Sequence, residues 1–353
     1  MKPNFKTIYV QAAIHSNPVW QRNAEAIWQR FPQAERVTVS SHQRIPQLFE
    51  ADPADWVTTK REQLVLGVRA TLRQESNGRS ADFIAASFSN GCLSACQYCY
   101  VARRKGGSNP LTLFVNLEDI SAAIRRHQAK LGPKLAPNQC DPHLWTYDIG
   151  CNADLSLDAQ VCDFPGRLIE DFAELPYAKA TFATKTVNDE YWLQHAPRGH
   201  TRLRYSLMPQ KVARYVDIGT SPISARIRSA NALVAAGYEV HFNFSPIIIY
   251  GGDEWRHDWT ELLQELDDVL TPETKAQAQC EAFFLTHQAA LHETNLRWNP
   301  RGEEFLWTPE LQVPKKTKPD LLVYDYSMRQ RELAWFKAVA ARLVPWCPVR
   351  YSF

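Results

Sequence analysis

The chain has 353 residues, of which 45% are hydrophobic and 22% charged, and its formal net charge is +2. These proportions are typical of folded globular proteins and exclude a wholly disordered chain. The small net charge excludes a histone-like polyelectrolyte but leaves a local basic surface open. No run approaches the roughly 18 apolar residues of a membrane helix, and the N-terminal segment lacks the apolar core of a secretory signal. We therefore expect a cytoplasmic protein with no membrane association.

The first 80 residues predict a small β-α-β subdomain. Strands are expected over 6–12 and 36–39, and a helix over 18–30, where apolar residues recur at helical spacing. The polar stretch 74–80 then marks a boundary. Residues 1–80 are accordingly assigned to an N-terminal α/β subdomain.

From residue 81 to residue 288, strand-like runs alternate with helical patterns. Helices are expected over 117–130, 160–173, 224–236 and 259–270, and strands over 82–88, 111–116, 143–150, 178–186, 202–207, 240–249 and 280–287. This spacing is typical of βα units that build a parallel sheet or a barrel, so the predicted fold class is α/β. Residues 289–353 break the alternation and are assigned to a C-terminal extension that ends in a helix.

A cluster of cysteines is the strongest chemical signal. Cys92, Cys96 and Cys99 have the spacing C-x3-C-x2-C, and three thiolates from one loop can ligate three irons of a 4Fe–4S cluster while the fourth iron stays open. A zinc site completed by a distant fourth ligand is the alternative. Cys140 and Cys162 lie outside any such pattern and are interpreted as structural.

The position of this cluster, after the first strand of a βα series, resembles the radical S-adenosylmethionine enzymes. The segments SADFIAASFSNGCLSACQYCYV, YDIGCNADLSLD, ATFATKT, RYSLMP and AGYEVHFNFSPIIIYGGDEW resemble more narrowly the spore photoproduct lyase family, from near the N-terminus to about residue 287. The resemblance implies a partial TIM-type (βα)6 barrel over residues 81–288. It also implies a 4Fe–4S cluster that reductively cleaves S-adenosylmethionine to a 5′-deoxyadenosyl radical. The superfamily's glycine-glycine-glutamate motif is not evident in LTLFVNLEDI, so the contact with the cofactor's amino group has no candidate.

The same resemblance implies roles for individual residues in the repair of a thymine-dimer-type DNA photolesion. Cys151 would return a hydrogen atom to the product radical, and it follows a predicted strand at the end where barrel chemistry collects. Tyr98 and Tyr100 would relay the radical back toward the cofactor. The residues that would contact S-adenosylmethionine are Lys185, Ser206 and Ser245. An electron donor such as flavodoxin or ferredoxin is implied as well.

Basic residues provide a possible footprint for DNA or another nucleic acid. The stretch 198–228 has a single acid, Asp217, and seven basic residues: Arg198, Arg202, Arg204, Lys211, Arg214, Arg226 and Arg228. Smaller basic groups occur at 103–105 and 315–318. Packing roles are favoured for the aromatic residues of the C-terminal extension and structural roles for His287 and His292.

Two alternatives remain at the level of the sequence. The first is a radical S-adenosylmethionine enzyme that acts on another nucleic acid or nucleotide. The second, from a different class, is a zinc-binding interaction protein without catalytic activity.

Overall fold

The structure, a computed structural model, describes residues 3–101 and 109–352. It divides into two compact units. The first contains Met1–Leu93, Val101–Leu203 and Ala236–Tyr238, and the second contains Ser94–Tyr100, Arg204–Ala235 and Glu239–Phe353. Among the described residues, no helix has the length and apolar character needed to cross a bilayer.

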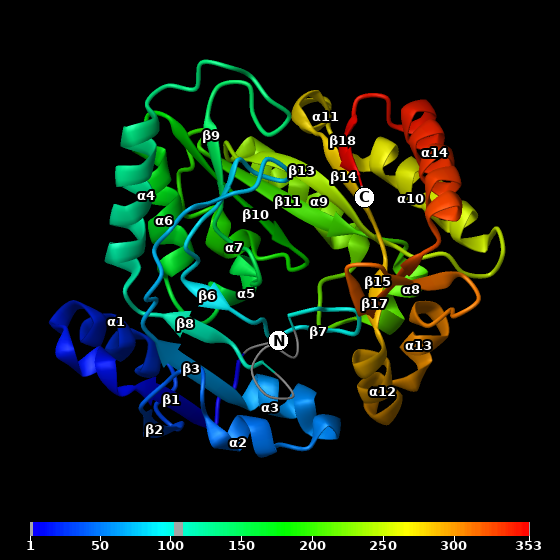
Figure 1. Cartoon of the computed structure of the whole chain (residues 1–353). Helices are drawn as coiled ribbons and strands as arrows, with labels where there is room; N and C mark the ends of the chain where they lie inside the picture. The colour runs from blue at the N-terminus through cyan, green and yellow to red at the C-terminus, as the bar shows by residue number, and fades with distance from the viewer. Residues whose placement is uncertain (1–2, 102–108, 353) are drawn as a thin grey trace. The chain divides into compact units, whose positions relative to one another are not determined.

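The first unit begins with a five-stranded sheet in the order β2-β1-β3-β8-β6. Its strands are β1 (Thr7–Gln11), β2 (Glu35–Val39), β3 (Gln63–Gly67), β6 (Ser89–Asn90) and β8 (Thr112–Phe114). The helices near its strands in the sequence, blue in Figure 1, are η1 (Ala12–Ser16), α1 (Pro18–Trp28), α2 (Pro46–Glu50), η2 (Pro53–Asp55) and α3 (Trp56–Glu62). Asn17 starts α1 where the sequence predicts a helix, because its side chain accepts the N–H of Val19 at 2.9 Å.

A mixed sheet of eight strands has the order β18-β14-β13-β11-β10-β9-β5-β4. The strands that lie in the first unit are β4 (Glu75–Ser76), β5 (Phe83–Ile84), β9 (Trp145–Asp148) and β10 (Ala178–Thr184). β5, β9 and β10 pair in parallel. The helices of this part are α4 (Leu117–Leu131), α5 (Leu155–Asp158), α6 (Phe164–Ala173) and α7 (Asp189–Trp192), with α4 beside α6 in Figure 1.

The remaining strands of this sheet are β11 (Thr201–Leu207), whose first three residues belong to the first unit, and β13 (Glu239–Ile247), β14 (Cys280–Phe284) and β18 (Val349–Ser352). The helices of the second unit up to β14 are α8 (Gln210–Val216), α9 (Ile223–Ala235), α10 (Glu254–Val269) and α11 (Pro272–Gln277). The sheet is parallel from β13 through β14 to β18. Alternating parallel strands and helices confirm the predicted α/β class.

The chain from β15 onward, which begins just before the predicted C-terminal extension, carries a separate three-stranded antiparallel sheet in the order β15-β17-β16. Its elements are β15 (Thr286–Gln288), α12 (Ala289–Trp298), α13 (Pro300–Leu306), β16 (Gln312–Lys315), β17 (Lys318–Tyr324) and α14 (Tyr326–Leu343). The helix predicted near the C-terminus is α14, and it lies beside α10 in Figure 1. Phe336 of α14 packs edge-on against Trp259 of α10 at 5.1 Å between ring centroids, which buries both rings.

Two observations differ from the sequence prediction. The run 111–116 does form a strand, β8, but this strand pairs in parallel with β3 of the N-terminal sheet rather than joining the barrel series. The run 82–88 forms only the two-residue strand β5. The division at residues 80 and 288 stays a prediction.

Candidate active site

The loop that leads into the cysteine cluster is fixed by a glycine. Gly91 has φ +89° and donates its N–H to the carbonyl oxygen of Asn152 at 2.9 Å. A Cβ at this position would lie 2.8 Å from the carbonyl oxygen of Pro110. Only glycine suits this backbone, and its hydrogen bond holds the residue before Cys92 against the residue after Cys151.

The Cys151 loop follows β9 and is organised by Asp154. The Asp154 carboxylate caps α5 and also accepts the Thr184 hydroxyl at 2.7 Å and the Lys185 N–H at 3.0 Å. Burial raises the pKa of Asp154, although these hydrogen bonds favour its charged form. The first unit thereby brings together the backbone segments of two predicted site residues, Cys151 and Lys185.

In the second unit, Tyr98 lies in a hydrogen-bonded network. β7 (Ala95–Cys96) pairs antiparallel with β12 (Asp217–Ile218), and the Tyr98 hydroxyl donates to the Asp217 carboxylate. Arg226 lies 3.4 Å from the same carboxylate and donates to the carbonyl oxygen of Ser206 at 2.7 Å. Burial and the charge of Asp217 raise the pKa of Tyr98 well above its usual value, so its phenol is neutral at physiological pH.

Gln97, between two cluster cysteines, is anchored to the C-terminal extension. It is fully buried and donates to the carbonyl oxygen of Asn299 at 2.8 Å, and its own carbonyl accepts from Asn295 at 2.9 Å. A Cβ at Gly302 would lie 1.6 Å from the Gln97 side-chain oxygen, so α13 needs glycine there. The extension therefore holds the middle of the cluster motif.

The other predicted site residues differ in exposure. Tyr100 is 58% exposed, whereas Ser206 in β11 is only 7% exposed. Ser245 lies in β13 between Phe244 and Ile247, where the pairing with β14 shifts register. Tyr98 and Tyr100 thus have different surroundings, despite their symmetrical positions around Cys99.

The cysteine side chains supply the type of ligand that an iron–sulfur cluster takes. All eight cysteines lie among the described residues, and none forms a disulfide. Cys96 is buried, Cys92 and Cys99 are half-buried, and the Cys99 N–H bonds to the Cys96 carbonyl in a tight turn. Soft thiolates near the surface are suitable ligands for such a cluster. Cys140 and Cys162, predicted to be structural, are both buried.

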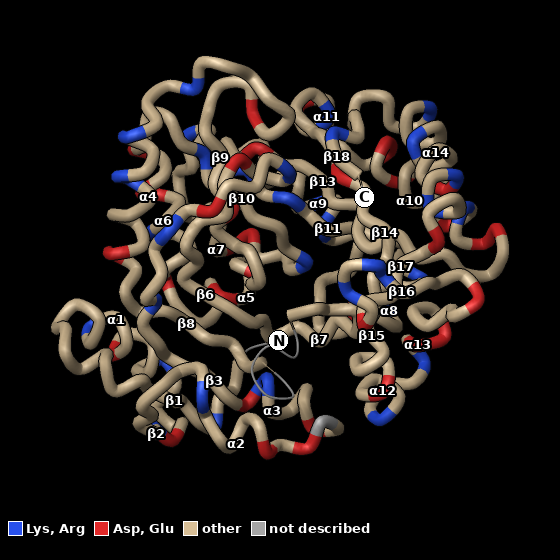
Figure 2. The backbone as a smooth tube through the Cα atoms, in the orientation of Figure 1, with Lys and Arg blue, Asp and Glu red and all other residues tan. Residues whose placement is uncertain are grey.

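The basic stretch 198–228 is not a continuous surface, which corrects the sequence prediction. Arg202, Arg204 and Arg226 are 2%, 3% and 0% exposed. Arg202 pairs with Asp141 at 2.9 Å and Arg204 with Glu281 at 3.6 Å. Figure 2 marks basic positions along β11, and every residue of that strand is buried. The group 103–105 lies outside the described residues.

The aromatic residues of the extension likewise include both packed and exposed side chains. Tyr324 is buried and accepts the N–H of Ile249 at 2.9 Å, and Trp307 stacks on His292. Tyr326 is 67% exposed. Packing, as predicted, explains the first two.

Sequence reasoning missed several residues that position the site: Gln97, Asn152, Asp217 and Arg226. Asp217 had one signal, as the single acid in a basic stretch. Asn152 has φ +70°, and its type was a weak signal, because asparagine is enriched among non-glycine residues with positive φ.

The α/β fold with a C-x3-C-x2-C loop places the chain in the radical S-adenosylmethionine class of lyases. The chain belongs to the spore photoproduct lyase family, because the family model described as spore photoproduct lyase matches residues 5–292. It is 28% identical to spore photoproduct lyase of Geobacillus sp. (strain Y412MC61) over 268 residues, 75% of this chain and 74% of that protein. It is 27% identical to the Bacillus subtilis (strain 168) enzyme over 236 residues, 67% of this chain and 66% of that protein.

Solved structures of spore photoproduct lyase have the same fold. One, a variant with bound AdoMet and dinucleoside spore photoproduct, matches with a TM-score of 0.85 and 22% identity over 100% of both chains. Another, complexed with dinucleoside spore photoproduct, also gives a TM-score of 0.85, with 21% identity and full coverage. The predicted partial TIM-type barrel is thereby confirmed.

Proposed function

We propose that this radical S-adenosylmethionine enzyme repairs a thymine-dimer-type DNA photolesion, with Cys151 as the hydrogen donor. The observation that carries the proposal is the pair of links in the first unit, from Gly91 to Asn152 and from Asp154 to Lys185. They fix the loop of the hydrogen donor to one cluster-loop residue and to a candidate cofactor residue. A relative solved with AdoMet and dinucleoside spore photoproduct supports this substrate class.

Cys92, Cys96 and Cys99 are proposed to hold a 4Fe–4S cluster through their thiolates. Lys185, Ser206 and Ser245 are proposed to contact S-adenosylmethionine. Together these groups would supply the 5′-deoxyadenosyl radical that starts the reaction. The buried Arg226 positions Ser206 through its carbonyl oxygen, so the strand at the cofactor contact is held independently of the cofactor.

Cys151 is proposed to give its S–H hydrogen to the thymine radical that remains once the dimer has been broken. Its thiol is half-buried, which limits the access of competing donors. Asp154 caps the helix that follows the Cys151 loop, which fixes the C-terminal end of this loop.

Tyr98 is proposed to restore the Cys151 thiol, with Tyr100 next in the relay. Its hydroxyl is oriented by donating to Asp217, and its O–H bond would break to give the hydrogen atom to the Cys151 thiyl radical, which re-forms the S–H bond and leaves a tyrosyl radical. Asp217 is a positioning residue here, and Arg226 lies 3.4 Å from its carboxylate.

The β16–β17 hairpin is proposed to contact DNA. Lys315, Lys316 and Lys318 are all exposed on it. Exposed lysines at a hairpin tip suit phosphate contacts. Reduction by a flavodoxin- or ferredoxin-type donor belongs to the same proposal.

An anaerobic assay with dithionite, S-adenosylmethionine and ultraviolet-irradiated DNA tests the function. We expect 5′-deoxyadenosine together with loss of the lesion and recovery of thymine, measured by mass spectrometry. Irradiated RNA and unirradiated DNA serve as parallel substrates. Repair confined to RNA, or cofactor cleavage with no lesion lost, would contradict the proposed substrate.

A further inference from the structure

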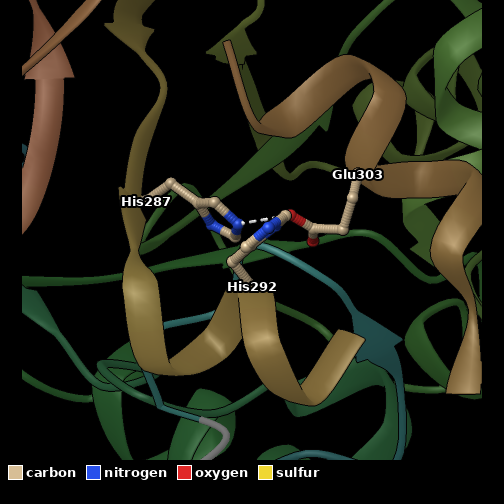
Figure 3. A group of neighbouring side chains, drawn as sticks. All are labelled: His287, His292 and Glu303. Atoms are coloured by element: carbon tan, nitrogen blue, oxygen red, sulfur yellow. Dashed lines mark hydrogen bonds and ion pairs between the residues drawn. The ribbon is translucent and has the colours of Figure 1, made fainter. Parts of the chain in front are cut away.

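Two histidines and a glutamate converge within residues 287–303, at the start of the C-terminal extension and just before it. His287 comes from β15, His292 from α12 and Glu303 from α13. Glu303 Oε2 lies 3.0 Å from His287 Nε2 and 2.5 Å from His292 Nδ1. The three ligand atoms lie within 4.8 Å of one another, and Figure 3 shows both rings directed at the same carboxylate.

The glutamate is oriented by a fourth residue. Asn295 donates to Glu303 Oε1 at 2.5 Å and, from the same nitrogen, to the Gln97 carbonyl oxygen. Oε1 is thus occupied, and Oε2 is the atom turned toward the histidines. In metal sites, a ligating carboxylate is commonly held in place by a hydrogen bond from a neighbouring residue, as it is here.

The site also contains a buried acidic group, the carboxyl group of Glu303. Glu303 is 4% exposed, His287 is 1% exposed, and across the described residues no lysine or arginine pairs with Glu303. Burial alone would raise the pKa of Glu303, but the hydrogen bonds from both histidines and Asn295 lower it. A buried carboxylate calls for a compensating cation, which here is either an imidazolium or a metal ion.

We propose that His287, His292 and Glu303 bind a divalent transition-metal ion, with zinc as the best match. Two imidazole nitrogens and one carboxylate oxygen form a common three-residue zinc set, which leaves a fourth position for water. The same set also accepts ferrous iron. His292 is the accessible member, with 18% of its side chain exposed, and its ring is held by stacking on Trp307 at 4.0 Å.

Such an ion would join β15, α12 and α13 at one point. Through Asn295 and Asn299, these helices hold Gln97 within the C-x3-C-x2-C motif. The metal would therefore stabilise the conformation of the segment that carries Cys96 and Cys99. It would take no part in the radical chemistry. The competing arrangement, a protonated His292 bonded to Glu303, needs no metal.

Metal content decides between these arrangements without any substrate. Full-length protein with a reconstituted cluster is freed of loosely bound metal, titrated with Zn²⁺ against a fluorescent zinc chelator, and analysed for zinc and iron. We expect one zinc per chain in addition to the cluster iron. Zinc-edge X-ray absorption should show nitrogen and oxygen ligands at about 2.0–2.1 Å and no sulfur at about 2.3 Å.

Variants assign the ligands. His292→Ala and the more conservative Glu303→Gln should each weaken zinc binding by about 100-fold or more, since even outer residues of zinc sites cost 10–100-fold. His257→Ala, which alters an exposed histidine paired with Glu261 on α10, should leave it unchanged. Ferrous iron or manganese in place of zinc, lost in the same two variants, would support the site and change only its ion.

Three results would overturn the proposal: no divalent metal retained beyond the cluster iron, sulfur in the zinc shell, or equal affinity in all variants. Sulfur ligands would place the zinc on the cluster cysteines instead. Each of these outcomes leaves the DNA-repair proposal standing, because the assay for repair is separate.

Discussion

The N–H of Gly91 donates to the carbonyl oxygen of Asn152 over 2.9 Å. This single backbone bond joins the neighbours of Cys92 and Cys151, which lie 59 positions apart in the sequence. Gly91 has φ +89° and Asn152 has φ +70°, so each loop adopts a conformation that most side chains disfavour. The conformation of each loop therefore depends on the other loop, and a substitution in one should alter the conformation of the other.

Gly91→Ala should impair cluster assembly. The left-handed backbone costs a non-glycine residue about 1–2 kcal/mol, and here the added Cβ also meets two backbone carbonyls. We expect a lower melting temperature and less iron after anaerobic reconstitution. Gly78→Ala is the matched control, since Gly78 has φ +68° but nothing within 4 Å of a Cβ. Equal iron content in the two variants would show that the Gly91 contacts do not matter.

Cys151→Ala should separate radical formation from clean repair. The proposed cluster and cofactor contacts lie on other residues, so 5′-deoxyadenosine should still form. Alanine has no weak S–H bond, and adducts of the thymine radical should therefore replace repaired thymine. Mass spectrometry of products from irradiated DNA measures this ratio, with Cys140→Ala as the control for a buried cysteine. Thymine as the sole product of the Cys151→Ala enzyme would remove Cys151 from the mechanism.

Tyr98→Phe should slow turnover and leave the cluster intact. The variant keeps the ring but loses the hydroxyl that donates to Asp217. We expect normal iron content and a fall in repair of roughly 100-fold or more, the lower end of a typical proton-transfer contribution. Tyr326→Phe, at an exposed tyrosine, should have no effect. Because the pKa of Tyr98 is raised, spectrophotometric titration should detect no phenolate at this position near neutral pH.

Asp141→Asn should destabilise the first unit. Asp141 is 4% exposed and pairs with Lys179 at 2.6 Å and Arg202 at 2.9 Å. Removing its charge leaves two cations without their acid, which costs about 3–5 kcal/mol in buried pairs. Glu174→Gln, in the exposed pair with Arg198, should cost at most about 1 kcal/mol. Chemical denaturation measures both.

The pH dependence of the Asp141 effect has a definite sign. Burial alone would raise the pKa of Asp141, but Lys179 and two backbone N–H groups lower it below 3.8. The carboxylate is thus more acidic in the folded state, so its stabilisation is present above about pH 4 and is lost as the pH falls through the lower folded value. The difference between wild type and Asp141→Asn should shrink in acid. A constant difference down to pH 3 would contradict this account.

Neutralising the β16–β17 hairpin should weaken DNA binding. The triple variant Lys315→Gln, Lys316→Gln and Lys318→Gln removes up to three phosphate contacts. The slope of log affinity against log salt should then fall by up to about 2.7, since each contact contributes about 0.9. Lys337→Gln, at an exposed lysine of α14, is the control. Fluorescence anisotropy over a salt series gives the slopes, and unchanged slopes would exclude the hairpin from the interface.

Local periodicity predicted the regular elements well. α4 spans Leu117–Leu131 against the predicted 117–130, and β11 spans Thr201–Leu207 against 202–207. Sheet membership was less predictable, because the pairing of β8 with β3 depends on residues about 47 positions away. The cysteine spacing indicated the site, whereas Gly91 and Asn152 meet only in the folded chain.

Of the sequence signals, charge was the poorest guide to which residues lie on the surface. Arginines in a sequence suggest a surface because burial of an unpaired charge is costly. Every residue of β11 is nevertheless buried, and Arg202 finds Asp141 in a distant loop. An amino-acid composition counts buried, paired arginines and exposed lysines alike. The two are distinguished only by the folded structure, which brings acidic partners to the buried arginines.

The anchoring of Gln97 by Asn299, 202 positions later, has a consequence for biosynthesis. During translation the cysteine motif leaves the ribosome long before α12 and α13 exist. At a synthesis rate of about 5–20 residues per second, the nascent motif waits at least ten seconds or so without the contacts that shape it. The motif can therefore acquire its final contacts only late in synthesis, and a chain truncated before α12 would lack the hydrogen bonds from Gln97 to Asn299 and from Asn295 to Gln97.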